Sequence, residues 1–380
     1  MSRSISFCAA ILVLFAIGSL AAAKSPTVII KVEEAGAKPH VDSKPPFRGQ
    51  RPTVDVALLL DTSNSMDGLI HQAKSQLWTI VQQFANAKKR GQTPVLRVAL
   101  FEYGNLNLPA SEGYIRQVVP LTDDLDKLSE ALFGLTTNGG DEYCGQVIDV
   151  AVKSLDWSKE PNGYKAIFVA GNEPFTQGPV DYKTACKQAI ERGVVVNTIH
   201  CGNHEEGRQG MWQDGARLAE GGFFNIDQDR AVVQIRCPQD EIIIRLNTDL
   251  NKTYLWYGAE RERRDYSENQ VAQDANAAGI GSGVVASRAA AKATSSYSNR
   301  NRDLVDTLRE DKDILRRVKT VELPELLQSM SADEREAYVK KTAAKRASIQ
   351  RQIAALSTER EAYLDKERKQ LADKSGDATL

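Results

Sequence analysis

Short apolar runs alternate with amphipathic stretches from residue 53 onward, and this alternation most constrains the fold. VDVALLL at 54–60 and KAIFVAG at 165–171 are apolar at nearly every position, as strands buried on both faces are. Such strands, separated by helices, predict a parallel sheet covered on both sides. We therefore expect a doubly wound α/β domain with a mostly parallel six-stranded sheet over residues 53–258. The expected strands are 54–60, 95–103, 114–121 (an edge strand), 165–171, 194–200 and 222–226.

The stretches between these strands have helical periodicity. Residues 67–88 place Leu69, Ala73, Leu77 and Ile80 on one face, which is the pattern of a helix packed on a sheet. Helices are also expected at 123–134, 144–157, 180–192 and 211–220.

The C-terminal third has a different composition. Residues 259–302 are rich in Ala, Ser, Asn and Gly, and we expect a low-complexity connector that is extended or weakly helical. Residues 303–380 predict a helical, coiled-coil-like tail, in which Ser331 and Glu334 form a capping box before a long helix. Its apolar stripe is narrow and interrupted by Arg360. The tail is therefore an exposed helix, a hairpin packing on itself or a partner, or a solvated spacer.

The N-terminus has the pattern of an export signal. Arg3 precedes the apolar run AAILVLFAIGSL and a run of alanines, which predicts a signal peptide at 1–23 cleaved near Ala23. An uncleaved membrane anchor is the alternative. Residues 24–52 are rich in Pro and Lys and are expected to be a flexible tether.

Charge and cysteine content narrow the partners and the chemistry. The net charge of -1 gives no reason to expect nucleic acid or an anionic membrane as a partner. An exported chain can form disulfides, but four cysteines allow three pairings and buried free thiols are equally compatible. His200 and His204 flank one of them without the spacing of a zinc site. The four cysteines are Cys144, Cys186, Cys201 and Cys237.

Polar residues follow three of the expected strands. DTSNSM occupies 61–66, GNEP occupies 171–174, and CGN occupies 201–203. Because the carboxyl ends of parallel strands meet at one edge of the sheet, these residues are expected to lie together, where such folds bind ligands.

The residues Asp61-Thr62-Ser63-Asn64-Ser65 fit the pattern D-x-S-x-S. Because this motif follows an expected buried strand and precedes an expected long helix, the chain resembles von Willebrand factor type A domains over about 53–258. The resemblance implies a metal-ion-dependent adhesion site with Mg²⁺ or Mn²⁺, in which Ser63 and Ser65 bind directly and Asp61 acts through water or a hydrogen bond. Hydroxyl ligands add no charge, so an acidic group of a partner protein can complete the metal shell.

Two positions depart from the family pattern. Asp141 stands where the family has a threonine, a variant that some members share, and Gly171 stands where it has an aspartate. Charge counting retains two carboxylates, so Asp61, Ser63, Ser65 and Asp141 are the predicted metal ligands, with Asn172 or Glu173 as an extra oxygen donor. The alternative is a degenerate site whose side chains only hydrogen-bond the loops together.

These features favour a non-enzymatic protein that is exported, either to the periplasm or into the medium. It would bind an unidentified protein partner at the predicted metal site, at the carboxyl edge of the sheet. No hydrolase elbow, phosphate loop or nucleophile–base pair is present. The tail would self-associate or dock to another component. Two rival hypotheses are an envelope scaffold with a vestigial metal site and a subunit of a metal-dependent assembly machine. The segment from AGNEPFTQGPVDY to NTIHCGN also resembles exported bacterial proteins described only by their type A domain.

Overall fold

The computed structural model describes residues 52–86, 94–160, 163–226 and 235–375. The predicted signal peptide and nearly all of the predicted tether lie outside these residues. Among the helices of the described ranges, none combines the length and apolarity that a membrane span requires.

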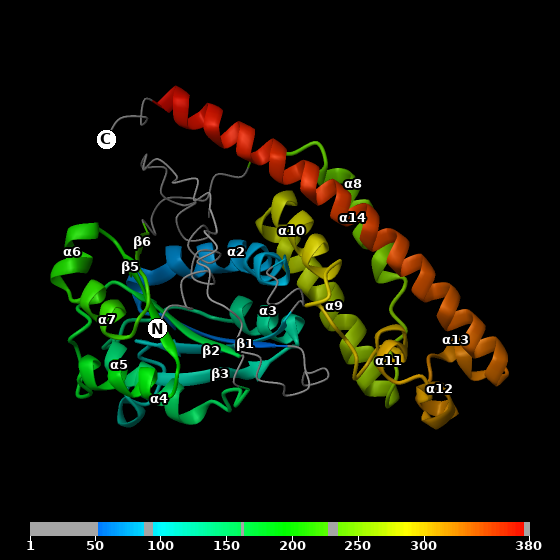
Figure 1. Cartoon of the computed structure of the whole chain (residues 1–380), viewed down its shortest axis with the longest axis horizontal. Helices are drawn as coiled ribbons and strands as arrows, with labels where there is room; N and C mark the ends of the chain where they lie inside the picture. Colours follow the sequence, from blue (N-terminus) through cyan, green and yellow to red (C-terminus); the bar gives the residue numbers. More distant parts are fainter. Residues whose placement is uncertain (1–51, 87–93, 161–162, 227–234, 376–380) are drawn as a thin grey trace, which may run out of the picture.

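A six-stranded sheet lies between layers of helices in the left part of Figure 1. Its order is β3-β2-β1-β4-β5-β6, and all neighbours are parallel except β3, which runs antiparallel to β2 at one edge. This confirms the predicted fold class. The strands are β1 (Thr53–Asp61), β2 (Val95–Tyr103), β3 (Ile115–Thr122), β4 (Tyr164–Gly171), β5 (Val195–Cys201) and β6 (Phe223–Ile226).

Helices cover both faces of the sheet because residues along each strand alternate between two cores. In β1, Val54 and Val56 join the core beneath α2 and α3, whereas Ala57 and Leu59 join the core beneath α4 and α5. The helices of the domain are α2 (Asp67–Asn86), α3 (Leu125–Phe133), α4 (Cys144–Ser154), α5 (Tyr182–Glu191), α6 (His204–Gln209), α7 (Trp212–Leu218) and α8 (Asp240–Asn251). Short 3-10 turns are η2 (Asn64–Met66), η3 (Ala110–Glu112) and η4 (Thr320–Glu322).

The structure contradicts the predicted connector at 259–302, which was expected to be extended or weakly helical. Most of this segment is helical and packed. It forms α9 (Glu260–Ile280) and α10 (Ser282–Lys292). Every residue of α10 after Ser282 is buried, between α2, α8, α9 and α14. Alanine is the strongest helix former, and its small side chain lets four helices approach closely. The composition that suggested a connector is therefore that of a tightly packed central helix.

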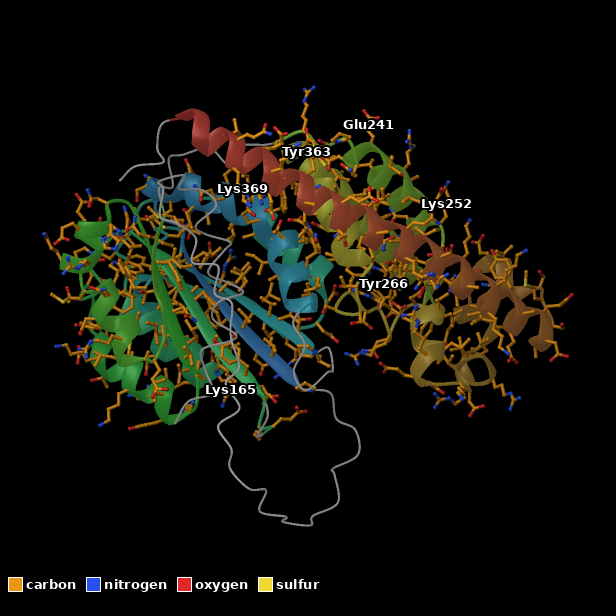
Figure 2. The ribbon with its side chains drawn as sticks, turned by 45° about the horizontal axis from the view of Figure 1, so that its top comes forward. Lys165, Glu241, Lys252, Tyr266, Tyr363 and Lys369 are labelled. Atoms are coloured by element: carbon orange, nitrogen blue, oxygen red, sulfur yellow. The ribbon has the colours of Figure 1, made fainter. Side chains whose placement is uncertain are left out.

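The tail contains α11 (Leu304–Glu310), α12 (Ile314–Arg317), α13 (Glu325–Gln328) and the long α14 (Ala332–Ser375). The Ser331 N–H donates to the Glu334 carboxylate, and the Glu334 N–H donates back to the Ser331 hydroxyl, which confirms the capping box. Figure 2, in which Glu241 on α8 and Tyr363 on α14 are labelled, shows these two helices side by side. Ile349 and Ile353 of α14 belong to the same core as Val54. The tail is therefore not a solvated spacer.

Buried ion pairs join these helices to one another and to the domain. Arg346 on α14 donates to Asp303 at 2.7 Å and to Asp306 at 3.0 Å, and its guanidinium lies over the Tyr254 ring. Arg288 on α10 pairs with Asp126 on α3 at 2.7 Å. Charged residues of the tail therefore serve as internal contacts. The four cysteines in the described ranges are buried free thiols.

Candidate functional site

The predicted motif D-x-S-x-S begins at the last residue of β1, and its residues hydrogen-bond to one another. Asp61 is the last residue of β1 and is fully buried. The Ser63 N–H donates to Asp61 Oδ1 at 2.8 Å, and the Ser63 and Ser65 hydroxyls are 3.2 Å apart. The loop thereby gathers a carboxylate and two hydroxyls at the carboxyl edge of the sheet, at the opposite end of β4 from Lys165 (Figure 2).

The segment after β4 meets this loop through Asn172. Asn172 Nδ2 donates to the Ser65 hydroxyl at 3.2 Å. Asn172 Oδ1 and Asp61 Oδ2 are both buried without a hydrogen-bond partner. Unpartnered buried oxygens are costly, and a cation is one partner that would satisfy them.

The Tyr103 side chain fills the space beside Gly171, the corner of the site where the family has an aspartate. Tyr103 ends β2 opposite Asp61 in the parallel register, and its hydroxyl donates to the Ala170 carbonyl at 2.9 Å. A β-carbon on Gly171 would lie 2.5 Å from that hydroxyl and 3.0 Å from Asp61 Oδ2. The missing aspartate therefore leaves no gap, because a buried tyrosine fills the space beside the glycine.

The second carboxylate beside Asp61 belongs to Glu142, a residue that the sequence reasoning missed. Asp141 is exposed, and its carboxylate accepts a hydrogen bond from the Tyr143 hydroxyl at 3.0 Å. Glu142 is 6% exposed. A β-carbon on Gly104 would lie 2.6 Å from Glu142 Cγ and 2.9 Å from Asp61 Oδ1, so both side chains flank this glycine. The structure thus brings Asp61, Ser63 and Ser65 together and turns Asp141 outward.

The two acids of the site disfavour each other's ionised form. Burial raises the pKa of Asp61 well above its usual value, the charge of Glu142 raises it further, and hydrogen bonds from Ser63 oppose both. Burial also raises the pKa of Glu142 to about 7, with a lowering contribution from Ser63 and raising contributions from Glu173 and Asp141. A bound divalent cation would relieve this repulsion.

The donor set fits a hard cation. Within the described residues no three His, Cys, Asp or Glu side chains converge as a set of metal ligands. The donors at this edge are of mixed type, namely two carboxylates, two hydroxyls and an amide oxygen. Mg²⁺ and Mn²⁺ accept such oxygen ligands and keep part of their water shell. The two unpartnered oxygens are the observation that favours a cation here.

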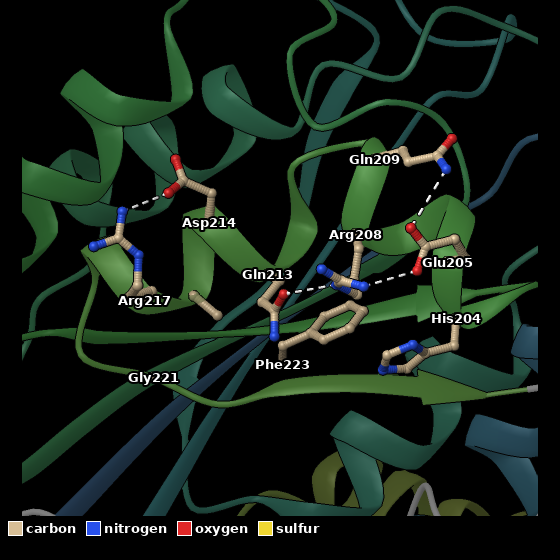
Figure 3. Close-up of a pocket in the computed structure, with 10 residues that line it drawn as sticks. His204, Glu205, Arg208, Gln209, Gln213, Asp214, Arg217, Gly221 and Phe223 are labelled. Atoms are coloured by element: carbon tan, nitrogen blue, oxygen red, sulfur yellow. Dashed lines mark hydrogen bonds and ion pairs between the residues drawn. The ribbon is translucent and has the colours of Figure 1, made fainter.

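A separate hollow of about 650 Å³ lies between α6, α7 and β6 (Figure 3). Its charges pair with each other: Arg208 with Glu205 at 2.9 Å and Arg217 with Asp214 at 2.6 Å. None of the predicted metal ligands lines it. This hollow therefore offers no unpaired charge to a ligand.

The sheet order and the oxygen-rich loops define a doubly wound α/β domain with its ligand edge at the carboxyl ends of β1 and β4. Residues 55–232 match the model of the von Willebrand factor type A domain. The chain therefore contains a von Willebrand factor type A domain, as the motif at Asp61 predicted. No curated protein matches the chain in sequence.

Several solved structures are similar to part of this chain. An aerotolerance-related membrane protein from Bacteroides fragilis, with multiple mutations to serines, has 17% identity over 46% of this chain and 92% of its own, with a TM-score of 0.32. BatB from Bacteroides thetaiotaomicron has 15% identity over 58% and 98%, with a TM-score of 0.34. Proximal thread matrix protein 1 from the mussel byssus, with a zinc-occupied MIDAS motif, has 16% identity over 47% and 43%, with a TM-score of 0.36.

Proposed function

We propose that the chain is a non-enzymatic binding protein whose type A domain contacts a partner protein through a divalent cation, Mg²⁺ or Mn²⁺. Asp61, Ser63, Ser65 and a carboxylate of the 141–142 loop would hold the cation at the carboxyl edge of the sheet. The observation that carries this proposal is the pair of buried, unpartnered oxygens, Asp61 Oδ2 and Asn172 Oδ1. A bound cation supplies an electrophilic centre, and an oxygen-bearing group of the partner completes its shell.

The surface around the site offers further contacts for a partner. Leu106 is 56% exposed, and one of its methyl groups lies 3.9 Å from where a β-carbon on Gly139 would be. Asn64 lies beside the same glycine. An apolar side chain and an amide at the rim are the kind of groups that add affinity around a central contact. The acidic partner group that the family resemblance implies would have to approach against the charges of Glu173 and Asp141.

Export to the periplasm or the medium is part of the same proposal, and it rests on the N-terminal sequence 1–23. The alternative, an envelope scaffold that assembles through α14, has less support from the packing. Val339, Ile349 and Ile353 of that helix are buried against the chain's own core. A scaffold of this type would form oligomers without metal, which sedimentation of the purified chain would detect.

Thermal stability in the presence of metal tests the proposal. A cation that binds only the folded state raises the melting temperature, by an amount that grows with its concentration. We expect millimolar Mg²⁺ or Mn²⁺ to raise the melting temperature of the full chain and to have no effect on Asp61→Ala. Glu191→Ala, which removes an exposed carboxylate at the end of α5, is the matched control and should retain the shift. No shift in the unaltered chain would rule out the cation site.

A further inference from the structure

We infer that Glu142, and not Asp141, supplies the second carboxylate of the cation site, and that the Asn172 amide oxygen takes the place of the family's aspartate at Gly171. This inference deepens the proposed function and depends on it. It assigns two specific ligands that differ from those expected from the sequence.

The first step is the direction of the Glu142 side chain. Gly104 has a φ of +78°, a left-handed conformation that favours glycine, and it lacks the side chain that would separate two acids. Glu142 Cγ and Asp61 Oδ1 lie 2.6 and 2.9 Å from the position where that β-carbon would be. The Glu142 N–H donates to Gln177 Oε1 at 3.0 Å, which fixes the backbone from which the side chain enters. Both acids therefore reach the same small space.

The second step is the engagement of Asp141. Its side chain is exposed, and the Tyr143 hydroxyl donates to Asp141 Oδ2 at 3.0 Å. By contrast, none of the ion pairs in the described part of the chain includes Glu142, although Glu142 is buried. A buried carboxylate without a cationic partner is unfavourable unless a cation joins it. Ser63 stabilises the Glu142 carboxylate by a hydrogen bond but supplies no positive charge, whereas Asp141 is exposed to water.

The third step is the corner at Gly171. Tyr103 leaves no room there for a side chain, and the next residue, Asn172, carries an amide oxygen. The Asn172 amide nitrogen donates a hydrogen bond to the Ser65 hydroxyl. Its amide oxygen is buried and has no hydrogen-bond partner, so it is available as an acceptor. Asp61 Oδ2 is unpartnered in the same way and lies beside the same corner. Two carboxylates, two hydroxyls and one amide oxygen then form the complete protein donor set.

Mn²⁺ binding by the full chain tests the assignment, followed by isothermal titration calorimetry and by the electron paramagnetic resonance signal of free Mn²⁺. We expect Glu142→Gln to weaken Mn²⁺ binding at least tenfold, which corresponds to about 1.4 kcal/mol. Asp141→Asn, the adjacent substitution of the same kind, should change it less than twofold. Asn172→Ala should also weaken binding at least threefold. Circular dichroism without metal identifies a variant that fails to fold. In that event Glu142→Asp, which keeps the charge but withdraws the carboxylate, replaces Glu142→Gln and should weaken binding as well.

The outcomes separate this assignment from the proposed function. A loss in Asp141→Asn that equals or exceeds the loss in the Glu142 variant would overturn the assignment of Glu142, while binding by the unaltered chain would still support a cation site. Unchanged affinity in a folded Asn172→Ala would overturn the role of the amide oxygen. Absence of Mn²⁺ binding in the unaltered chain, or equal binding by Asp61→Ala, would refute the proposed function itself.

Discussion

At the scale of single residues, the contact between Gly171 and Tyr103 decides what the site can contain. The sequence shows the glycine where the family has an aspartate, but it does not show that a tyrosine from another strand fills the corner. The sequence contains a hint of this contact, since Asp61 follows one predicted strand and Tyr103 ends another, and the two strands pair in parallel. Asp141 and Glu142 were harder to separate, because a turn of the loop by one residue exchanges which side chain faces inward.

A methyl group at position 171 tests this contact. Gly171→Ala should lower the free energy of unfolding by about 2 kcal/mol, because its β-carbon would overlap the Tyr103 hydroxyl. In a Tyr103→Phe background the same substitution should cost less, since the hydroxyl is gone. Urea unfolding of the four variants of this double-mutant cycle measures the difference. Additive effects of the two substitutions would show that the tyrosine does not fill the corner.

At the scale of elements, α14 is held by buried charges as well as by apolar residues. The sequence predicted its start, because the capping box at Ser331 and Glu334 is a local signal. Its packing could not be predicted, since Arg360 interrupts a narrow apolar stripe, and charged residues such as Arg346 are typical of an exposed helix. Both arginines are buried because they pair with carboxylates from distant segments of the sequence. Arg346 pairs with Asp303 and Asp306, and Arg360 pairs with Asp240.

Removal of one buried arginine should therefore be costly. Arg346→Ala leaves Asp303 without its cation and leaves Asp306 with only the more distant Arg309, at 3.8 Å, so we expect a loss of about 3–5 kcal/mol in the free energy of unfolding. Arg351→Ala, in the same helix but exposed, should change it by about 0.5 kcal/mol or less. Chemical denaturation of both variants gives the comparison, and similar losses would contradict a buried role for Arg346.

Acid should weaken the junction of α9 with α10 through Asp274. Burial alone would raise the pKa of this carboxyl, but the charges of Lys292 and Arg288 outweigh it and lower the pKa to about 2. The resulting stabilisation is present above the unfolded pKa near 4 and is lost as the pH falls toward 2. At about 1.4 kcal/mol per pKa unit it amounts to roughly 2 kcal/mol. The stability difference between the unaltered chain and Asp274→Asn should shrink over this pH range, and a constant difference would contradict the prediction.

At the scale of the whole molecule, α10 and the middle of α14 form part of the same core as the sheet, whereas α11, α12 and α13 pack in a separate cluster with Leu255. Fold class followed from the sequence because buried strands and amphipathic helices leave strong periodic patterns. The division into a domain, a connector and a tail did not anticipate the packing, because the small and polar residues of α10 have the composition of a connector although nearly all of them are buried. Arg288 of α10 lies 4.5 Å from the ring of Trp78 on α2, which shows how closely the two parts are joined.

This continuity predicts one cooperative unfolding transition for the full chain. Tryptophan fluorescence reports on Trp78, Trp157 and Trp212, which are buried in the type A domain, together with Trp256. Far-ultraviolet circular dichroism is dominated by the helices, many of which follow residue 258. The two signals should change with the same midpoint. Separate midpoints would indicate that the tail unfolds independently of the domain.

The central claim concerns the position of a cation at the carboxyl edge of the sheet. Anomalous diffraction from crystals of the full chain grown with Mn²⁺ tests it most directly. We predict a peak within coordination distance of Asp61, Ser63, Ser65 or Glu142 oxygens, beside the Asn172 amide. A peak at another location, or no peak at this edge at saturating Mn²⁺, would contradict the claim.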